Sequence, residues 1–490
     1  MADQWFDVVV VGAGLSGIGM ARHLKVECPD LSFTVLEARE RLGGTWDLFR
    51  YPGVRSDSDM YTLGYNFRPW TGAKAIADGG SILSYLQDTA RETGVEPHIQ
   101  TQTRVIAADW SSADAAWTLT IDQAGERRTF ACRFVVMCTG YYDYERGHAP
   151  KFPGAEAFAG RIVHPQFWPE DLNVAAKRVA VIGSGATAMT LVPALADQGA
   201  AVTMVQRSPT YVVARPAADR VANGLRRALG AGGAARTIRW RNALIGQFFY
   251  SQMRKNPKPA AKKLIGWVRD HLGPDYDVET HFTPRYDPWD QRLCLVPDGD
   301  LFEALRTGRA SVVTGSIERF DADGIVMADG THVPADIVVT ATGLELKLMD
   351  DMPVSFDGTP IDFARTLNYK GMMFSDVPNL AYVFGYTNAS WTLKADLTAA
   401  YVCRLLKAMR AKGMRSATPR VGEGEAGDEA FLDFTSTYVQ RAVDRFPKQG
   451  RRAPWRLHQN YLKDLMALRF GRVDDAMEFA SPETARKDAA

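Results

Sequence analysis

The chain has 490 residues, 46% of them hydrophobic and 23% charged, so it can bury a large core spread over two or three domains. A net charge of +1 argues against nucleic-acid binding, and no apolar run is long enough to span a membrane. The five cysteines are scattered and fit neither a disulfide framework nor a metal site, and the N-terminus lacks a signal core, so we predict a cytoplasmic protein.

The first predicted unit is a strand, a turn and a helix near the N-terminus. Residues 6–11 are valine-rich and predict a strand, and residues 16–25 have helical composition. Between them lie three glycines, Gly12, Gly14 and Gly17. Glycine is needed there because a side chain would block the turn and the approach of the backbone to a pyrophosphate. A strand over 32–36 ends in Glu37, which can accept hydrogen bonds from ribose hydroxyls, so the site suits FAD or NAD rather than NADP.

Glycine, aromatic and charged residues follow in a distinctive order. They are Gly43-Gly44-Thr45-Trp46, Arg50-Tyr51-Pro52-Gly53 and Arg55-Ser56-Asp57-Ser58-Asp59. This block resembles segments of flavin-dependent monooxygenases. The resemblance implies that the first site holds FAD, with Gly44, Thr45 and Trp46 along the dinucleotide and Asp57 beside the isoalloxazine. Tyr61 is a further candidate for the FAD site, although Trp46 and Tyr61 can equally be core aromatics.

The next informative segment is the connector Phe158-Ala-Gly-Arg-Ile-Val-His-Pro-Gln-Phe-Trp-Pro169. Its spacing of Phe, Gly, His and Trp-Pro resembles the signature of Baeyer-Villiger monooxygenases. We interpret His164 as a residue that pins the linker of a rotating NADP domain rather than as a general base. Phe158 and Trp168 are expected to be packing anchors, and Gly160 a point of backbone freedom.

A second strand, turn and helix unit begins with the strand 178–182. Its turn residues are Gly183, Ser184, Gly185, Ala186, Thr187 and Ala188, with alanine in place of the third glycine. The next strand, 201–205, is followed by Arg207 and Ser208 and by no acid. Arginine can pair with a ribose 2'-phosphate and serine can donate to it, so this site should prefer NADPH.

Two dinucleotide sites imply electron transfer from nicotinamide to flavin. Because no cysteine pair forms a local redox motif, oxygen is the remaining electron acceptor. A helix-rich, Ala/Arg/Lys-rich stretch over 216–263 predicts an insertion, and it leads to Arg292. By family resemblance Arg292 is the catalytic arginine, held by Asp57, and it stabilises a peroxide anion and the oxyanion formed on a ketone. Gln291 stands where many relatives have lysine.

Two segments that each follow a valine-rich strand and end at Gly140 and Gly343 resemble the family's crossings between the FAD and NADP domains, which implies that the chain crosses there. The predicted fold class is α/β, with two Rossmann-like domains, one for FAD and one for NADP, and a helical insertion. A helix beginning near Thr392 would direct its positive end at the flavin. The expected parts are 1–140 and 344–490 for the FAD domain, 141–210 and 301–343 for the NADP domain, and 211–300 for the insertion.

The motifs occur in family order over nearly the whole chain, which is identified as a class B flavoprotein monooxygenase of the Baeyer-Villiger family, resembling its ethionamide-activating branch. The resemblance implies that FAD, NADPH and O2 convert small ketones to esters or lactones through a C4a-peroxyflavin, and sulfides to sulfoxides. An N- or S-oxygenating flavin monooxygenase and, less favoured, a non-enzymatic flavin redox sensor remain alternatives. The basic run 255–263 leaves weak peripheral membrane contact open, although a solvated helix face is commoner.

Overall fold

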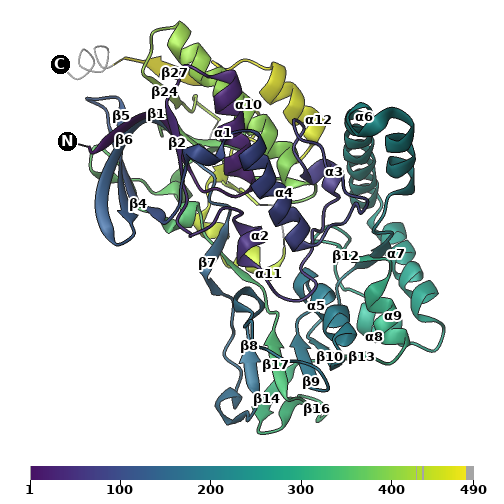
Figure 1. Ribbon diagram of the computed structural model, residues 1–490. Helices are drawn as coiled ribbons and strands as arrows, with labels where there is room; N and C mark the ends of the chain where they lie inside the picture. The colour runs from purple at the N-terminus through teal and green to yellow at the C-terminus, as the bar shows by residue number, and fades with distance from the viewer. Residues whose placement is uncertain (1, 426, 433–434, 482–490) are drawn as a thin grey trace.

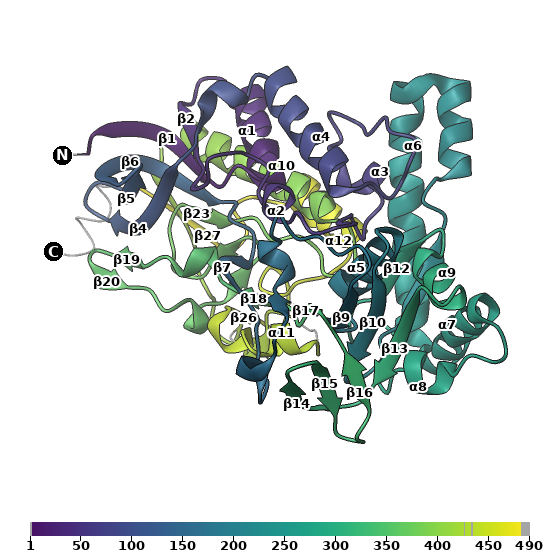
Figure 2. The same cartoon turned by 60° about the horizontal axis from the view of Figure 1, so that its bottom comes forward.

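Two sheets with parallel strands at their centres organise the chain, and helices cover them (Figure 1). The computed structural model describes residues 2–425, 427–432 and 435–481. The sheets are built from different parts of the sequence, and Figure 2 brings the smaller one to the front. The predicted α/β fold class is confirmed.

The larger sheet has nine strands in the order β20-β19-β4-β5-β6-β1-β2-β3, with β23 also paired to β6. Strand β1 runs parallel to β2 and β6, whereas β4, β5 and β6 form an antiparallel meander. Helices α1 (Leu15–Glu27) and α10 (Trp391–Ala411) contribute buried residues to the core on one face of this sheet. The strands are β1 (Gln4–Val11), β2 (Phe33–Leu36), β3 (Ile99–Gln100), β4 (Thr103–Ser111), β5 (Ala116–Gln123), β6 (Glu126–Met137), β19 (Val354–Phe356), β20 (Thr359–Pro360) and β23 (Leu380–Tyr382).

The smaller sheet has five parallel strands in the order β13-β10-β9-β17-β8. Its core on one face includes α5 (Ala186–Asp197) and α9 (Asp300–Arg306), and the other face packs against an antiparallel sheet. The parallel strands are β8 (Arg161–Val163), β9 (Arg178–Ile182), β10 (Ala201–Gln206), β13 (Ala310–Thr314) and β17 (Ile337–Thr340). The antiparallel strands are β14 (Ile317–Asp321), β15 (Gly324–Met327) and β16 (His332–Pro334).

The predicted insertion lies between β10 and β13 and is not purely helical. It contains α6 (Arg220–Lys255), α7 (Pro257–Leu272) and α8 (Val278–Phe282). In addition, β11 (Val212–Arg215) and β12 (Cys294–Pro297) pair in parallel at its two ends, which the sequence analysis did not predict. Helix α6 breaks at Gly230, where φ is 72°, and folds back as a helical hairpin (Figures 1 and 2).

The two sheets are linked by crossing segments, in which β7 (Tyr142–Gly147) pairs antiparallel with β18 (Leu344–Leu346). The domain boundaries at 140 and 343 stay a prediction, and this link follows both of them directly. Short elements complete the described chain: α2 (Thr45–Leu48), α3 (Met60–Leu63), α4 (Gly79–Glu92), β21 (Asn368–Tyr369), β22 (Met373–Phe374), β24 (Ser416–Pro419), β25 (Glu429–Ala430), α11 (Thr437–Gln440), β26 (Lys448–Gln449), α12 (Tyr461–Asp464), a π-helical turn (Leu465–Phe470) and β27 (Met477–Ala480). Over the residues described, no helix combines the length and apolar character needed to cross a membrane.

Candidate active site

The first glycine-rich turn joins β1 to α1 and leaves no room for a side chain at Gly12 or Gly17. Gly12 has a φ of 102°, and a Cβ atom built on it would lie 2.7 Å from the carbonyl oxygen of Cys138. A Cβ on Gly17 would lie 1.8 Å from the carbonyl oxygen of Gly12, and one on Gly14 would touch Gly44 at 3.5 Å. The backbone is therefore close-packed around the start of α1, where free N–H groups favour an anionic ligand.

Glu37 ends β2 as predicted and is 5% exposed. One carboxylate oxygen accepts from the N–H of Ala13 at 2.7 Å, and the other accepts from the N–H of Arg39 at 2.9 Å. Burial raises the pKa of Glu37, and these two backbone donors oppose that rise. Each oxygen keeps a lone pair beyond these bonds, so the side chain is held in place while it remains able to accept from ribose hydroxyls.

The segment after Glu37 bends around the same turn. A Cβ on Gly44 would lie 3.0 Å from the Cα atom of Gly14, so the two glycines face each other. Thr45 Oγ1 lies 3.2 Å from Tyr144 Oη, and Trp46 packs partly buried against the core beneath α3 and α4. This brings Gly44, Thr45 and Trp46 close to the first glycine turn.

A buried carboxylate that the sequence analysis missed anchors this segment. Asp47 is 1% exposed and accepts from Arg39 at 2.6 Å, Arg41 at 3.1 Å and Arg50 at 3.0 Å. Burial by itself would raise the pKa of Asp47, but the three guanidinium groups hold it below its usual value. Only the density of arginines between residues 39 and 50 signalled this cluster in the sequence.

The second glycine-rich turn, between β9 and α5, is more open than the first. A Cβ on Gly183 would lie 2.3 Å from the carbonyl oxygen of Ala341, but one on Gly185 would meet nothing within 4 Å. Ser184 Oγ donates to the carbonyl of Ser208 at 2.9 Å, which ties the turn to the end of β10. Thr187, in the first turn of α5 beside Ala186, contacts Tyr51, which lies in the segment that follows α2.

The end of β10 carries a buried neutral side chain followed by an exposed cation. Gln206 is 1% exposed and donates to the carbonyl of His281 at 2.8 Å and to Thr314 Oγ1 at 2.9 Å. Arg207 and Ser208 are exposed, and within the described residues Arg207 has no carboxylate partner. Gln206 occupies the position that corresponds to Glu37 at the first site, so this position carries no negative charge at the second site.

Arg292 and Asp57, the two predicted catalytic residues, lie within electrostatic range of each other inside the protein. Burial raises the pKa of Asp57, and Arg292 and Arg55 oppose that rise. Burial would lower the pKa of Arg292, but Tyr141, Tyr438, Tyr142 and Asp57 around it raise it overall. In the part of the chain that the structure describes, no ion pair within 4.0 Å joins Asp57 to Arg292, so direct contact between them is not observed.

The tyrosines beside Arg292 come from two distant segments. Tyr141 and Tyr142 follow the crossing at Gly140 directly, so their position in the sequence was a usable signal. Tyr438, on α11, had no such signal because it lies 146 residues beyond Arg292 and in no motif. The Nε atom of Arg292 is buried and has no hydrogen-bond partner. This guanidinium can therefore donate to an added acceptor.

The loop that carries Arg292 is held from two sides. The carbonyl of Asp290 accepts from the N–H and the hydroxyl of Thr435 at 3.0 and 2.9 Å, and its carboxylate pairs with Arg254 of α6 at 2.6 Å. Nearby, Arg55 pairs with Asp300 of α9 at 2.5 Å, which joins the first unit to the second. The second guanidinium nitrogen of Arg55 is a buried donor without a partner, like Arg292 Nε.

His164 lies against the crossing segment. A Cβ built on Gly147 would lie 1.9 Å from His164 Cε1, and burial lowers the pKa of the imidazole. Gln166, two residues on, donates to the carbonyl of Asp143 in β7 at 2.7 Å. At Gly160 the φ is not positive, and an added Cβ would lie 2.3 Å from the Asp336 carbonyl oxygen, so close packing favours glycine there. Its role as a point of backbone freedom stays a prediction.

The start of α10 reaches the first glycine turn. Trp391 Nε1 donates to Ser16 Oγ of α1 at 2.8 Å. The hydroxyl of Thr392 is fully buried and donates its proton to the carbonyl of Leu63, so the backbone N–H is the donor of this residue that remains for a ligand. The helix begins at Trp391, within the segment that the sequence analysis singled out.

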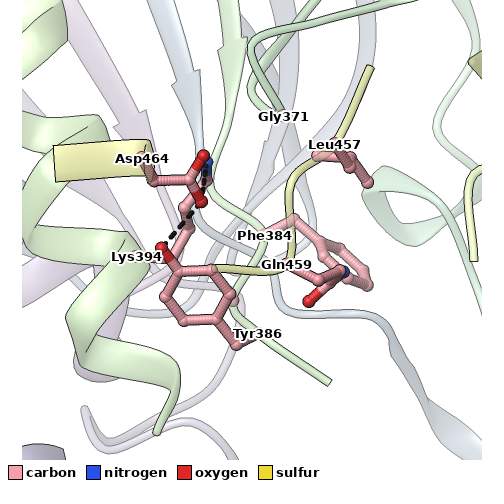
Figure 3. Close-up of a pocket in the computed structure, with 8 residues that line it drawn as sticks. Gly371, Phe384, Tyr386, Lys394, Leu457, Gln459 and Asp464 are labelled. Atoms are coloured by element: carbon pink, nitrogen blue, oxygen red, sulfur yellow. Dashed lines mark hydrogen bonds and ion pairs between the residues drawn. The ribbon is translucent and has the colours of Figure 1, made fainter. Parts of the chain in front are cut away.

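Lys394, one turn into α10, is held by a buried network. Its Nζ lies 3.0 Å from Asp464 of α12, and Tyr386 donates to the same carboxylate at 2.7 Å (Figure 3). The cavity beside them has a volume of about 10 Å³, enough for a single water at most. This cluster satisfies its own charges and joins α12 to α10.

Tyr61 lies at the contact between α3 and α6. It packs against α6 together with Ala222, Ala234 and Ile238, and its hydroxyl has no hydrogen-bond partner. It lines a cavity of about 140 Å³ between the first unit and α6. The residues lining this cavity include Tyr65, Trp70, Arg226, Arg236 and Arg239.

All five cysteines are buried and free. No group of His, Cys, Asp or Glu within the described residues could hold a metal ion. The observed features suit a dinucleotide at each turn: close-packed glycines, helix N-termini, a buried acid at one site and an exposed arginine at the other, with unpartnered buried donors between them.

Comparisons with known proteins agree with this arrangement. The family model "Flavin-binding monooxygenase-like" matches residues 75–222, and a model of an NAD(P)-binding Rossmann-like domain matches residues 10–70. Among solved structures, an oxidised steroid monooxygenase bound to NADP superposes with a TM-score of 0.74 over 98% of this chain and 100% of that one, at 22% identity. A structure of OTEMO in an FAD-bound form gives a TM-score of 0.75, also at 22% identity, over 97% and 99%. These likenesses concern the fold.

Several curated protein sequences share more identity with this chain than those solved structures do. The FAD-containing monooxygenase EthA of Mycobacterium tuberculosis (strain ATCC 25618 / H37Rv) is 52% identical over 96% of this chain and 97% of its own length. The corresponding protein of Mycolicibacterium smegmatis is 49% identical over 96% of each chain, and the putative FAD-containing monooxygenase MymA of M. tuberculosis is 48% identical over 97% of each. The predicted family is confirmed: this chain belongs to the FAD-containing monooxygenases.

Proposed function

We propose that this monooxygenase is an NADPH-dependent Baeyer-Villiger enzyme, which inserts one oxygen atom of O2 into small ketones to give esters or lactones and also oxidises sulfides to sulfoxides. The observation that supports the proposal most is the environment of Arg292. Tyr141, Tyr142, Tyr438 and Asp57 lie within electrostatic range of its guanidinium, which keeps a buried donor without a partner. A fixed cation of this kind stabilises negative charge on oxygen better in a dry interior than in water.

The chain's own residues then have separate tasks. Bound FAD, once reduced, supplies the activated oxygen. Arg292 is the proposed catalytic group, because an arginine stays charged at any relevant pH and can donate to the attacking oxygen and to the oxyanion that forms on the ketone. Asp57 balances the charge of Arg292 across the site.

We propose that FAD binds along Gly12, Gly14, Gly17, Glu37 and the segment Gly44–Trp46, and that NADPH binds at the second turn. The exposed Arg207, with Ser208 beside it, is free to pair with a 2'-phosphate. The neutral Gln206 supports this choice, because an acid there would repel the phosphate. The proposed FAD domain comprises 1–140 and 344–490, and the NADP domain 141–210 and 301–343 around the insertion 211–300.

The test is aerobic turnover of the purified protein with NADPH, using a linear methyl ketone and a thioether in separate reactions and identifying products by mass. Ester formation supports the proposal. Sulfoxide without ester would favour an N- or S-oxygenating monooxygenase, and steady NADPH consumption without any oxygenated product would contradict the assigned substrates. NADH at the same concentration is the control for the second site.

A further inference from the structure

Residues 220–272, which form α6 and α7, hold a charge imbalance that the net charge of the chain conceals. This segment carries 12 of the 58 Lys and Arg residues but only 1 of the 57 Asp and Glu residues. Its formal charge is therefore +11, which leaves −10 on the rest of a chain whose total is +1. Charge of one sign is concentrated at one place in the fold.

Part of this charge is neutralised by ion pairs. Arg239 pairs with Asp396, Arg241 with Asp219, Arg254 with Asp290, and Arg269 with Glu279. The lysines are different. Lys255, Lys258, Lys262 and Lys263 are all exposed, and none has a carboxylate partner within the described part of the chain. Lys263 instead contacts the face of the Trp267 ring at 5.2 Å.

The same two helices expose large apolar side chains. On α6, Phe248 is 58% exposed and Phe249 42%, with Leu244 and Ile245 similarly open, and on α7 Trp267 is 39% exposed. Of the fourteen exposed large hydrophobic residues in the described chain, seven lie between residues 220 and 272. An apolar set this concentrated marks an interaction surface on a water-facing helix.

These exposed side chains do not lie on the face of α6 that packs against the rest of the protein. The inner side of α6 is occupied by Arg239 and Ala243, which are buried against α3, α10 and Tyr386. Leu244, Ile245, Phe248 and Phe249 fall on the remaining circumference at helical spacing. Between residues 244 and 249, the outward face of α6 is thus largely apolar.

The position of the surface suits a large, flat partner. Figures 1 and 2 place α6 and α7 together at the end of the molecule opposite both chain termini. The surface continues onto the π-helical turn after α12, where Met466 is 62% and Phe470 66% exposed. That segment adjoins α6 through the rings of Trp240 and Tyr461, whose centroids are 5.6 Å apart.

We propose that the α6–α7 end is a peripheral docking surface for anionic lipid headgroups, with Phe248, Phe249 and Trp267 inserted at the boundary with the acyl chains. Exposed aromatics beside unpaired lysines are the combination that interfacial helices use. A second copy of the chain fits poorly, because a two-fold contact would bring two sets of the same unpaired lysines together. Nucleic acid would leave Leu244 and Ile245 without an apolar partner. This inference is independent of the proposed substrate.

The experiment uses the full-length FAD-loaded protein and vesicle flotation. Vesicles containing phosphatidylglycerol should carry the protein with them, vesicles of phosphatidylcholine alone should not, and high salt should release it. The triple variant Lys258→Gln, Lys262→Gln, Lys263→Gln should bind about a hundredfold more weakly, at about fivefold per cation. The pair Phe248→Ser with Phe249→Ser should lose at least about tenfold.

Matched control variants distinguish binding through this surface from nonspecific electrostatic or hydrophobic binding elsewhere on the protein. Lys151→Gln with Lys177→Gln removes exposed cations elsewhere, and Trp5→Ser with Val26→Ser removes exposed apolar groups elsewhere. Both controls should bind as the parent does. Equal binding of parent and surface variants would overturn the proposal. The proposal would also be overturned if the protein did not bind vesicles but formed a dimer that the Phe248 and Phe249 changes dissociate. A third contrary result would be displacement of the protein from vesicles by duplex DNA at low concentration. FAD content and NADPH oxidation without vesicles confirm that each variant is folded.

Discussion

The two glycine-rich turns share a motif but differ in how tightly the protein packs around them. At the first turn, a Cβ on Gly17 would lie 1.8 Å from the carbonyl oxygen of Gly12. At the second, Ala188 occupies the matching position with a fully buried side chain, and Gly185 faces open space. A close-packed turn suits a cofactor that stays bound, whereas an open turn suits one that must enter and leave in each cycle.

The same two regions also differ in charge. Glu37 is a buried carboxylate held by two backbone N–H groups, while Gln206 is neutral and donates to the insertion and to β13. The turn itself selects only a dinucleotide. The residue after the following strand decides which dinucleotide is accepted, because it meets the ribose.

The largest expected effect tests the packing difference. Gly17→Ala should destabilise the protein by about 3 kcal/mol or more, and the purified protein should contain little FAD, because the new Cβ meets backbone that cannot move. Ala188→Gly should cost only about 1 kcal/mol, from helix propensity. Chemical denaturation and the flavin-to-protein absorbance ratio measure both. Similar losses in the two variants would remove the contrast between the turns.

The next effect concerns the point where both cofactors would meet. Arg292→Ala should lower the rate of product formation about a hundredfold to a thousandfold, because one preorganised donor to the developing oxyanion is lost. FAD content should stay the same, which distinguishes this variant from Gly17→Ala. Arg292→Lys should recover part of the rate, since a charge returns without the planar fork. A rate within tenfold of the parent for Arg292→Ala would contradict the catalytic assignment.

A smaller effect sharpens the charge comparison. Arg207→Ala should lower the preference for NADPH over NADH about tenfold to a hundredfold through KM, because a charge-assisted contact to the 2'-phosphate contributes about 1.5 to 3 kcal/mol. Steady-state kinetics with both nucleotides measure it. Glu37→Gln is the matched change at the first site and should weaken FAD retention while it leaves the NADPH preference alone. An unchanged preference in Arg207→Ala would mean that another group meets the phosphate.

A further effect, which appears only as the pH is changed, tests how the helices behind the turns are anchored. Burial would lower the pKa of His23 on α1, but Asp396 and Glu27 raise it to about 9. α5 has no charged residue before Asp197. Because the folded pKa is raised, the stabilisation is fully present below about pH 6.5 and is lost as pH rises to about 9, a change of about 3 kcal/mol. His23→Gln should abolish this alkaline loss in denaturation curves at the two pH values. A parent-like loss in the variant would assign the effect to another group.

Local elements followed closely from the sequence. The strand 178–182 has the bounds predicted for it, the first strand begins two residues earlier than expected, and α1 extends the predicted helix by one and two residues at its ends. The parallel pair β11 and β12 was missed because its strands are 82 residues apart and neither carries a hairpin signal. The candidate site divides in the same way: Arg292 and Asp57 follow from motifs, whereas Tyr438 beside Arg292 and the Arg55–Asp300 pair do not.

The sequence by itself determined the two dinucleotide turns, the acid after one and the arginine after the other, since these depend on the sterics and charge of a few consecutive residues. It also contained the charge of residues 220–272. Only the tertiary structure decided which distant side chains surround Arg292 and which face of α6 points outward. Both depend on burial between segments far apart in the chain, and burial is settled by the packing of the whole fold rather than by any local pattern.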